Sequence, residues 1–134
     1  MAVLKNDRNE SSAEFVRNAR RLYIFTMDRC AHFPKRYTFI LSVKMCNLAE
    51  EIYDNVKRAN SYPYPFKVKE IASREMYFLK TIELLDSLVG HISIAREKFS
   101  ISDALMEEWI EYIDSEYRLI RGVMKSDRVC LNYI

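Results

Sequence analysis

The chain has 134 residues, of which 49% are hydrophobic and 30% charged, and its formal net charge at pH 7 is +2. This balance is typical of one folded domain and excludes a disordered chain. Only two glycines and three prolines are present, too few for a sheet protein with many tight turns, so the sequence predicts an all-α fold.

The sequence also carries expectations about the compartment. No stretch approaches the roughly 20 apolar residues that a membrane-spanning helix needs, and residues 1–12 lack the apolar region of a secretory signal. The cysteines Cys30, Cys46 and Cys130 lie far apart, without a CxxC pair, which predicts free thiols in a reducing environment. We therefore expect a cytoplasmic protein with no membrane partner.

The first helix is expected over residues 12–32. Ser11 followed by Glu14 matches a capping box, in which each side chain satisfies the other residue's free amide. Apolar residues recur at helical spacing from Phe15 to Cys30 and predict one buried face.

The second and third helices are expected over residues 35–60 and 67–98. Pro34 ends the first helix and suits the first turn of the second, where a missing amide hydrogen costs nothing. The segment SYPYPF, residues 61–66, separates the two. Gly90 inside the third costs about 1 kcal/mol relative to Ala, and it indicates close helix packing or a bend.

The fourth helix is expected over residues 103–127, with Ser102 as its N-cap. It carries two adjacent apolar seams. One suits the core, and the second would serve another side of the core or a subunit interface. Its charges are segregated, because residues 103–116 hold six acids without Lys or Arg, whereas residues 118–128 hold four bases against one acid.

Four long amphipathic segments with short connections predict one domain, residues 1–134. The expected architecture is an antiparallel up-down-up-down four-helix bundle.

A basic zone lies in the first half of the chain. Its members are Arg17, Arg20, Arg21, Arg29, Lys35, Arg36 and Lys44. Asp28 is the single acidic residue in the same stretch. Such a zone could neutralise several phosphates and give salt-sensitive binding to nucleic acid. The alternative is an ordinary solvated face. A basic and an acidic zone on one small protein suggest an anionic partner, self-association between unlike surfaces, or both.

Signatures of catalysis and metal binding are missing. Neither histidine, His32 or His91, follows a glutamate by three residues as in di-iron bundles, and no HExxH, GxSxG or glycine-rich phosphate loop occurs. Cys30 and Cys46 fall on apolar stripes and are interpreted as core thiols. We expect no metal, no cofactor and no enzymatic activity.

The aromatic residues allow two interpretations. Core and interface packing is the first. The second is base stacking on Tyr37, Tyr62 or Tyr64, which requires that these rings be exposed.

The order of the segments resembles one known family. YIFTMDRCAHFPKRYTFILSVKM followed by LAEEIYDNVKRAN resembles the first helical hairpin of the Avd proteins, the accessory variability determinants of diversity-generating retroelements. REMYFLKTIELLDSLVGHISIAREKFSIS with EEWIEYIDSEYRLIRGVMKS resembles the second hairpin, so the resemblance covers about residues 15–127. The related four-helix proteins encoded in ribosomal-RNA intervening sequences typically carry Asn-Ile-Ala-Glu-Gly where IYDNVKRAN stands here, which favours the Avd family.

The resemblance implies a specific function. Avd proteins are non-enzymatic four-helix bundles that assemble as homopentamers, bind nucleic acid and a reverse transcriptase, and support mutagenic copying of a template repeat. The nucleic acid here would be RNA or an RNA–DNA hybrid. By basic character and helix position, the implied contacts are the basic zone above and a second group, Arg121, Lys125 and Arg128. The alternative is a protein-interaction bundle of the intervening-sequence type with no nucleic-acid role.

Overall fold

The computed structural model describes residues 13–133, which are almost entirely helical. The four α-helices are α2 (Glu14–Cys30), α3 (Val43–Asn60), α4 (Val68–Lys98) and α5 (Asp103–Leu131). A 3₁₀ turn, η1 (Lys35–Tyr37), and a π-helical segment, η2 (Thr38–Ser42), lead directly into α3. No strand occurs between residues 13 and 133, and the predicted all-α class is confirmed.

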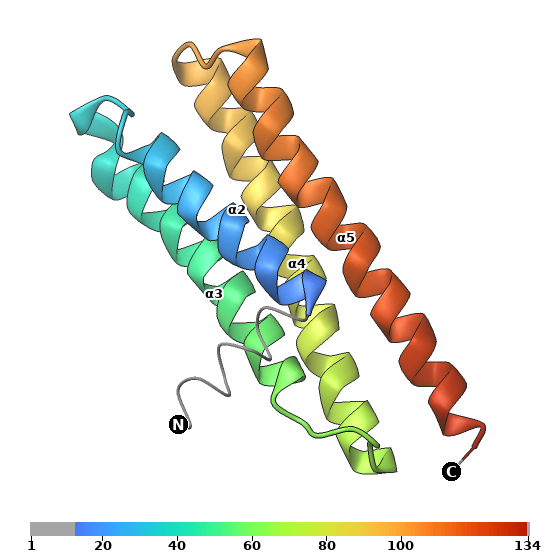
Figure 1. Ribbon diagram of the computed structural model, residues 1–134. Coiled ribbons are helices and arrows are strands. Elements are labelled where there is room, and N and C mark those ends of the chain that lie inside the picture. The colour runs from blue at the N-terminus through green and yellow to red at the C-terminus, as the bar shows by residue number, and fades with distance from the viewer. Residues whose placement is uncertain (1–12, 134) are drawn as a thin grey trace, which may run out of the picture.

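The helices enclose one common core. α2 packs against α3 and α5, and α4 packs against the same two helices. Figure 1 shows residues 31–34 and 99–102 at one end of the molecule and residues 61–67 at the other. The first two connections touch, because the rings of Phe33 and Phe99 lie 4.6 Å apart. We call this the 33/99 end.

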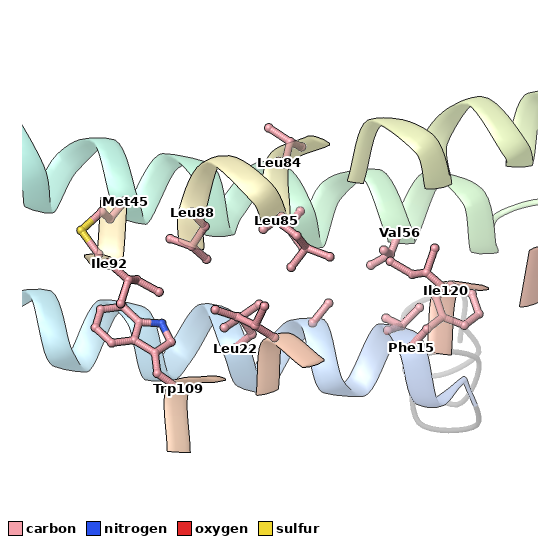
Figure 2. Close-up of a cluster of buried hydrophobic side chains, with 14 of the residues drawn as sticks. Phe15, Leu22, Met45, Val56, Leu84, Leu85, Leu88, Ile92, Trp109 and Ile120 are labelled. Atoms are coloured by element: carbon pink, nitrogen blue, oxygen red, sulfur yellow. The ribbon is translucent and has the colours of Figure 1, made fainter. Parts of the chain in front are cut away.

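The core consists of apolar side chains from all four helices. Figure 2 shows Leu22 and Phe15 of α2 facing Leu85 of α4 and Ile120 of α5. Trp109 of α5 is also fully buried. Each large apolar side chain buried in this way contributes about 1.5–3 kcal/mol.

The buried indole of Trp109 has a polar partner. Its Nε1 donates a hydrogen bond of 3.1 Å to Oγ1 of Thr26, and its ring contacts Phe25 edge-on, at 5.8 Å between centroids. The bond satisfies two buried polar groups that would otherwise destabilise the fold. Tyr112, from the second apolar seam, lies against Phe25 too, so this seam serves the α2 side of the core.

The helix boundaries differ from the expected ones at several points. α2 begins at Glu14 after Ala13, which makes no side-chain cap, and it ends at Cys30; Ser11 lies outside the described residues. Ser102 is confirmed as the N-cap of α5, since its Oγ accepts a hydrogen bond of 3.3 Å from the amide of Leu105. α5 extends to Leu131.

The start of the second helical segment is irregular. Pro34 precedes a 3₁₀ turn rather than the first turn of an α-helix, and the π-helical segment η2 follows before regular α-helix begins at Val43. The expectation of an α-helix from residue 35 was therefore wrong in its first two turns. Phe39 and Ile40 in η2 are 85% and 58% exposed, so this part of the chain follows no simple core-facing stripe.

Gly90 does not mark close helix packing. A methyl group added at its Cα would meet nothing within 4 Å, and α4 is continuous from Val68 to Lys98. The packing interpretation was wrong.

A buried ion pair lies toward the end opposite to the 33/99 end. Arg74 of α4 donates to Asp127 of α5 from Nε at 2.8 Å and from Nη2 at 3.4 Å. Its Nη1 donates to the carbonyl oxygen of Ala59 at 2.7 Å, and its guanidinium stacks on Phe66 at 4.1 Å. One side chain thus joins α3, α4, α5 and the 61–67 connection, and Asp127 anchors the last turns of α5.

Each helix between residues 13 and 133 is too short or too polar to span a bilayer.

Candidate nucleic-acid interface

The outer side of α2 carries three arginines. Val16, Ala19 and Leu22 are fully buried, so Arg20 and Arg21 point away from the core and are exposed. Arg17, whose Nη2 contacts Glu14 at 3.3 Å, precedes them on the outer side.

The charges of Arg20 and Arg21 are not neutralised locally. Neither forms an ion pair with any residue in the described range 13–133, whereas an exposed pair such as Arg17–Glu14 does form nearby. Unpaired guanidinium groups on a helix surface can bind phosphate oxygens, often in bidentate geometry.

Lys35 and Arg36 extend the basic surface around the 33/99 end. Both are exposed in η1. The guanidinium of Arg36 lies 5.1 Å from the ring centroid of Tyr37, and Tyr37 packs on Phe99 at 5.2 Å. No acidic residue occurs in residues 29–49, so Lys35 and Arg36 have no acid among their neighbours along the chain.

Arg29 contributes only part of its side chain to that surface. Its guanidinium lies 5.5 Å from the ring centroid of Phe25, and its Nε is buried without a hydrogen-bond partner among the described residues. The neighbouring His32 is exposed, and its Nδ1 lies 2.8 Å from the carbonyl oxygen of Asp28, to which it would donate.

Lys44 lies apart from the arginines of α2. It lines a hollow of about 240 Å³ together with Leu48 of α3 and His91 of α4. The side of α3 that faces α2 is marked instead by Tyr53, whose ring lies 6.1 Å from that of Tyr23. Lys44 therefore lies on the side of α3 that faces α4, away from α2, and it does not share a face with the α2 arginines.

The second basic group lies on a different face of the bundle. Arg128 contacts Glu75 of α4 at 2.7 Å, and Arg121 stacks on Tyr117 at 5.3 Å. The Tyr117 hydroxyl in turn donates to Asp86 of α4. These contacts place the group on the side of α5 that faces α4, away from the outer side of α2.

The aromatic residues considered for base stacking also lie apart. Tyr64 is 76% exposed and packs edge-on against Phe66 at 5.5 Å, in the 61–67 connection. Tyr37 is partly buried on Phe99, at the opposite end, and Tyr62 is partly buried. The three rings do not form one stacking platform.

The two nearby thiols lie against each other in the α2–α3 interface. Cys30 is buried, Cys46 is partly buried, and both line the same hollow. Burial raises the pKa of both thiols above the ordinary value, which disfavours the nucleophilic thiolate. Within residues 13–133, no group of three or more His, Cys, Asp or Glu side chains is placed to hold a metal ion.

The structure contains two buried polar clusters that were not predicted from the sequence. Glu116 is fully buried, and Asn18 Nδ2 donates to its Oε1 at 3.0 Å and to the carbonyl oxygen of Tyr112 at 2.8 Å. Burial raises the pKa of the Glu116 carboxyl to about 8, and the Asn18 hydrogen bond partly opposes this rise. The other cluster is the Arg74–Asp127 pair.

A sequence signal for both clusters does exist. Glu116 follows Ile113 by three residues, and Arg74 follows Ile71 by three, so each lies inside an apolar stripe at helical spacing.

Comparisons with known proteins give no assignment. No protein-family model matches the chain, and no curated protein and no solved structure shows significant similarity to it.

Proposed function

We propose that this protein is a non-enzymatic accessory protein of a diversity-generating retroelement, which binds nucleic acid and a reverse transcriptase to support mutagenic reverse transcription. The resemblance of both helical hairpins to Avd proteins motivates the class of function. The observation that carries the nucleic-acid role is the exposure of Arg20 and Arg21, which form no ion pair within residues 13–133.

The proposed binding surface runs from the outer side of α2 to the 33/99 end. It comprises Arg17, Arg20, Arg21, Lys35 and Arg36, with a smaller part for the half-buried Arg29. Lys35 and Arg36 lie on η1, the short turn that follows α2, and the other members lie on α2 itself. We therefore expect contacts to phosphates, with strong salt dependence and little sequence preference.

We further propose the up-down-up-down topology and assembly into a homo-oligomer in the cytoplasm. The placement of the connections at alternate ends in Figure 1 supports the topology. RNA or an RNA–DNA hybrid is the expected ligand, because the partner enzyme would copy RNA into DNA.

The test is binding of a fluorescently labelled single-stranded RNA, followed by anisotropy at several salt concentrations. We expect the Arg20→Ala/Arg21→Ala double variant to bind at least tenfold more weakly than the wild type at low salt, since each lost phosphate contact also removes counterion release. The slope of log K against log salt should become less steep by the amount that corresponds to roughly two phosphate contacts.

A matched control removes two exposed charges from another face. Lys69→Ala/Lys80→Ala lies on α4, on the far side of the core from α2, and should leave RNA binding within about twofold of the wild type. Equal losses in both double variants would indicate only a net-charge effect. Absence of RNA binding at low salt in the wild type would contradict the nucleic-acid role.

A protein-interaction bundle without nucleic-acid binding is the second candidate. The observation that favours it is the exposure of Phe39 and Ile40 at 85% and 58%, since large apolar side chains exposed side by side commonly mark contact sites for partners. Under this alternative the salt series shows no RNA binding even at low salt, while a pull-down recovers a protein partner with the wild type and not with Phe39→Ser.

A further inference from the structure

One side of α5 carries charge that is sorted along the helix. Its N-terminal half presents four exposed acids, and its C-terminal half presents four exposed bases. The acids are Asp103, Glu107, Glu111 and Asp114, and the bases are Arg118, Arg121, Lys125 and Arg128. We call this surface the α5 stripe.

The members of the α5 stripe share one side of the helix. All four acids and Arg118 line one shallow hollow of about 630 Å³, at the seam between α5 and α4. Arg121 and Lys125 follow Arg118 at steps of three and four residues, which keeps them on the same side. Arg128 contacts Glu75 of α4, so the stripe continues along the seam.

The helix dipole alone does not account for this order. It favours acids in the first turn and bases in the last turn, and its effect falls off within those turns. Asp103 and Arg128 lie there, but Glu111, Asp114 and Arg118 lie near the middle of the helix. A sharp change of sign at the helix centre therefore needs another cause.

The two halves match in register. Glu107, Glu111 and Asp114, the inner acids, each lie as many residues before position 116 as one base of the stripe lies after it. The outermost pair, Asp103 and Arg128, matches to within one residue. The inner pairs are Glu107 with Lys125, Glu111 with Arg121, and Asp114 with Arg118. Consider two copies of α5 packed antiparallel through their stripes, with the twofold axis at the level of residue 116 along the helix. This arrangement would place every acid opposite a base of the other copy.

The inner charges are available for such contacts. Within residues 13–133, none of the six inner side chains forms an ion pair; only the outermost two do, Asp103 with Arg96 at 3.1 Å and Arg128 with Glu75. The hollow also has an apolar part, because Ile110 on its wall is 42% exposed. Gly122, in the basic half, has open space beside it, which would let a second helix approach.

We propose that the α5 stripe is a homodimer contact, in which two copies of the chain pair their α5 helices antiparallel across a twofold axis. The partner is a second copy because the stripe is complementary to itself in charge order and in register. An isologous contact requires this property: residue i meets residue j, and j meets i.

The contact is expected to be reversible. The stripe spans roughly 37 Å and, with a helix about 10 Å wide, covers roughly half of the 800 Å² that each partner buries in a standard interface. Most of its pairs are exposed charges. We therefore expect a dissociation constant in the micromolar range that weakens at least tenfold between about 50 mM and about 500 mM NaCl.

This inference does not depend on the proposed nucleic-acid role, and it separates the two basic groups by task. Arg121 and Lys125 would contact the second copy, whereas Arg20, Arg21 and the 33/99 end remain free for nucleic acid. A twofold contact gives dimers, and it would join two rings face to face if a ring also formed through another surface.

The test is sedimentation velocity of the full chain with charge-reversed variants. Glu111→Lys places two bases opposite each other, and Arg121→Glu places two acids opposite each other, so each variant alone should lose the twofold contact and sediment as a smaller species than the wild type at the same concentration. A 1:1 mixture of the two variants restores both opposite-charge pairs in a heterodimer. The double variant Glu111→Lys/Arg121→Glu restores them in a homodimer.

Glu108→Lys is the matched control, since Glu108 is exposed on α5 but lies outside the hollow that the stripe lines; it should leave the dimer intact. Circular dichroism checks that every variant is folded. Recovery of the dimer in the mixture and in the double variant supports the proposal. A wild type that stays monomeric at about 200 µM and low salt, or a dimer that Glu111→Lys and Glu108→Lys affect equally, overturns it. Neither result bears on RNA binding, which is measured separately through Arg20 and Arg21.

Discussion

The Arg74 side chain is the most heavily engaged polar group in the molecule. It is paired with Asp127, bonded to a carbonyl oxygen at the end of α3 and stacked on an aromatic ring of the 61–67 connection. Both partners of the ion pair are almost completely buried. Removing one partner of such a pair leaves an uncompensated buried charge, which costs more than the intact pair contributes.

We therefore predict that Arg74→Met destabilises the protein by about 3–5 kcal/mol, because the Asp127 carboxylate stays buried without its cation. Urea unfolding followed by circular dichroism measures the change. The control is Arg128→Met, which breaks the mostly exposed pair with Glu75 and should cost at most about 1 kcal/mol. The double variant Arg74→Met/Asp127→Leu should regain much of the loss; failure to regain any would show that the contacts to Ala59 and Phe66 dominate.

Glu116 predicts a pH dependence of stability. Burial raises the pKa of its carboxyl in the folded protein to about 8, above the value of about 4.3 in an unfolded chain. Between these two values the folded state binds more protons than the unfolded state, so this group's contribution to stability is full below about pH 4.3 and is lost as the pH rises through about 8.

The variant Glu116→Gln removes this titration and keeps the shape of the side chain. We expect the free energy of unfolding of the wild type, relative to the variant, to fall by at most about 1.4 kcal/mol per pH unit over that window. Urea titrations at a series of pH values measure the difference. Parallel pH profiles for the two proteins would mean that the carboxyl ionises normally.

Among the elements, α5 begins at a serine whose side chain caps the helix. The Ser102 hydroxyl accepts the amide hydrogen of Leu105, and we predict that Ser102→Ala costs about 1 kcal/mol in urea unfolding through loss of this cap. Ser100 lies exposed in the same connection and caps no helix, so Ser100→Ala should change stability by less than about 0.5 kcal/mol. Equal effects would assign the loss to the connection as a whole rather than to the cap.

The success of sequence reasoning differs from element to element for physical reasons. α4 was expected at nearly its observed bounds, because its apolar spacing and the flanking proline-rich segment are local signals. The π-helical segment η2 was not, since a π-turn uses the same residue types as an α-helix and leaves no separate signal in the sequence. Glu116 and Arg74 were missed because charged residues were assigned to the surface by type, although both lie on apolar stripes.

In the molecule as a whole, basic residues that are grouped in the sequence lie on different faces of the bundle. Sequence order grouped Lys44 with Arg20 and Arg21, but Lys44 lies on the side of α3 that faces α4, away from α2. The sequence could give the sign and the helix position of each basic residue. It could not give which residues share a face, because that depends on the rotation of each helix about its axis and on which helices are neighbours.

The placement of Trp109 has a practical consequence. It is the only tryptophan in the chain, and it is fully buried between Thr26, Phe25 and Phe33, toward the 33/99 end. Emission from tryptophan, excited selectively over the tyrosines, therefore reports on the α2–α5 interface at that end alone, whereas ellipticity averages over every helix. If the opposite end frays first, the two signals will change at different denaturant concentrations, and their separation will measure how cooperatively the two ends of the molecule unfold.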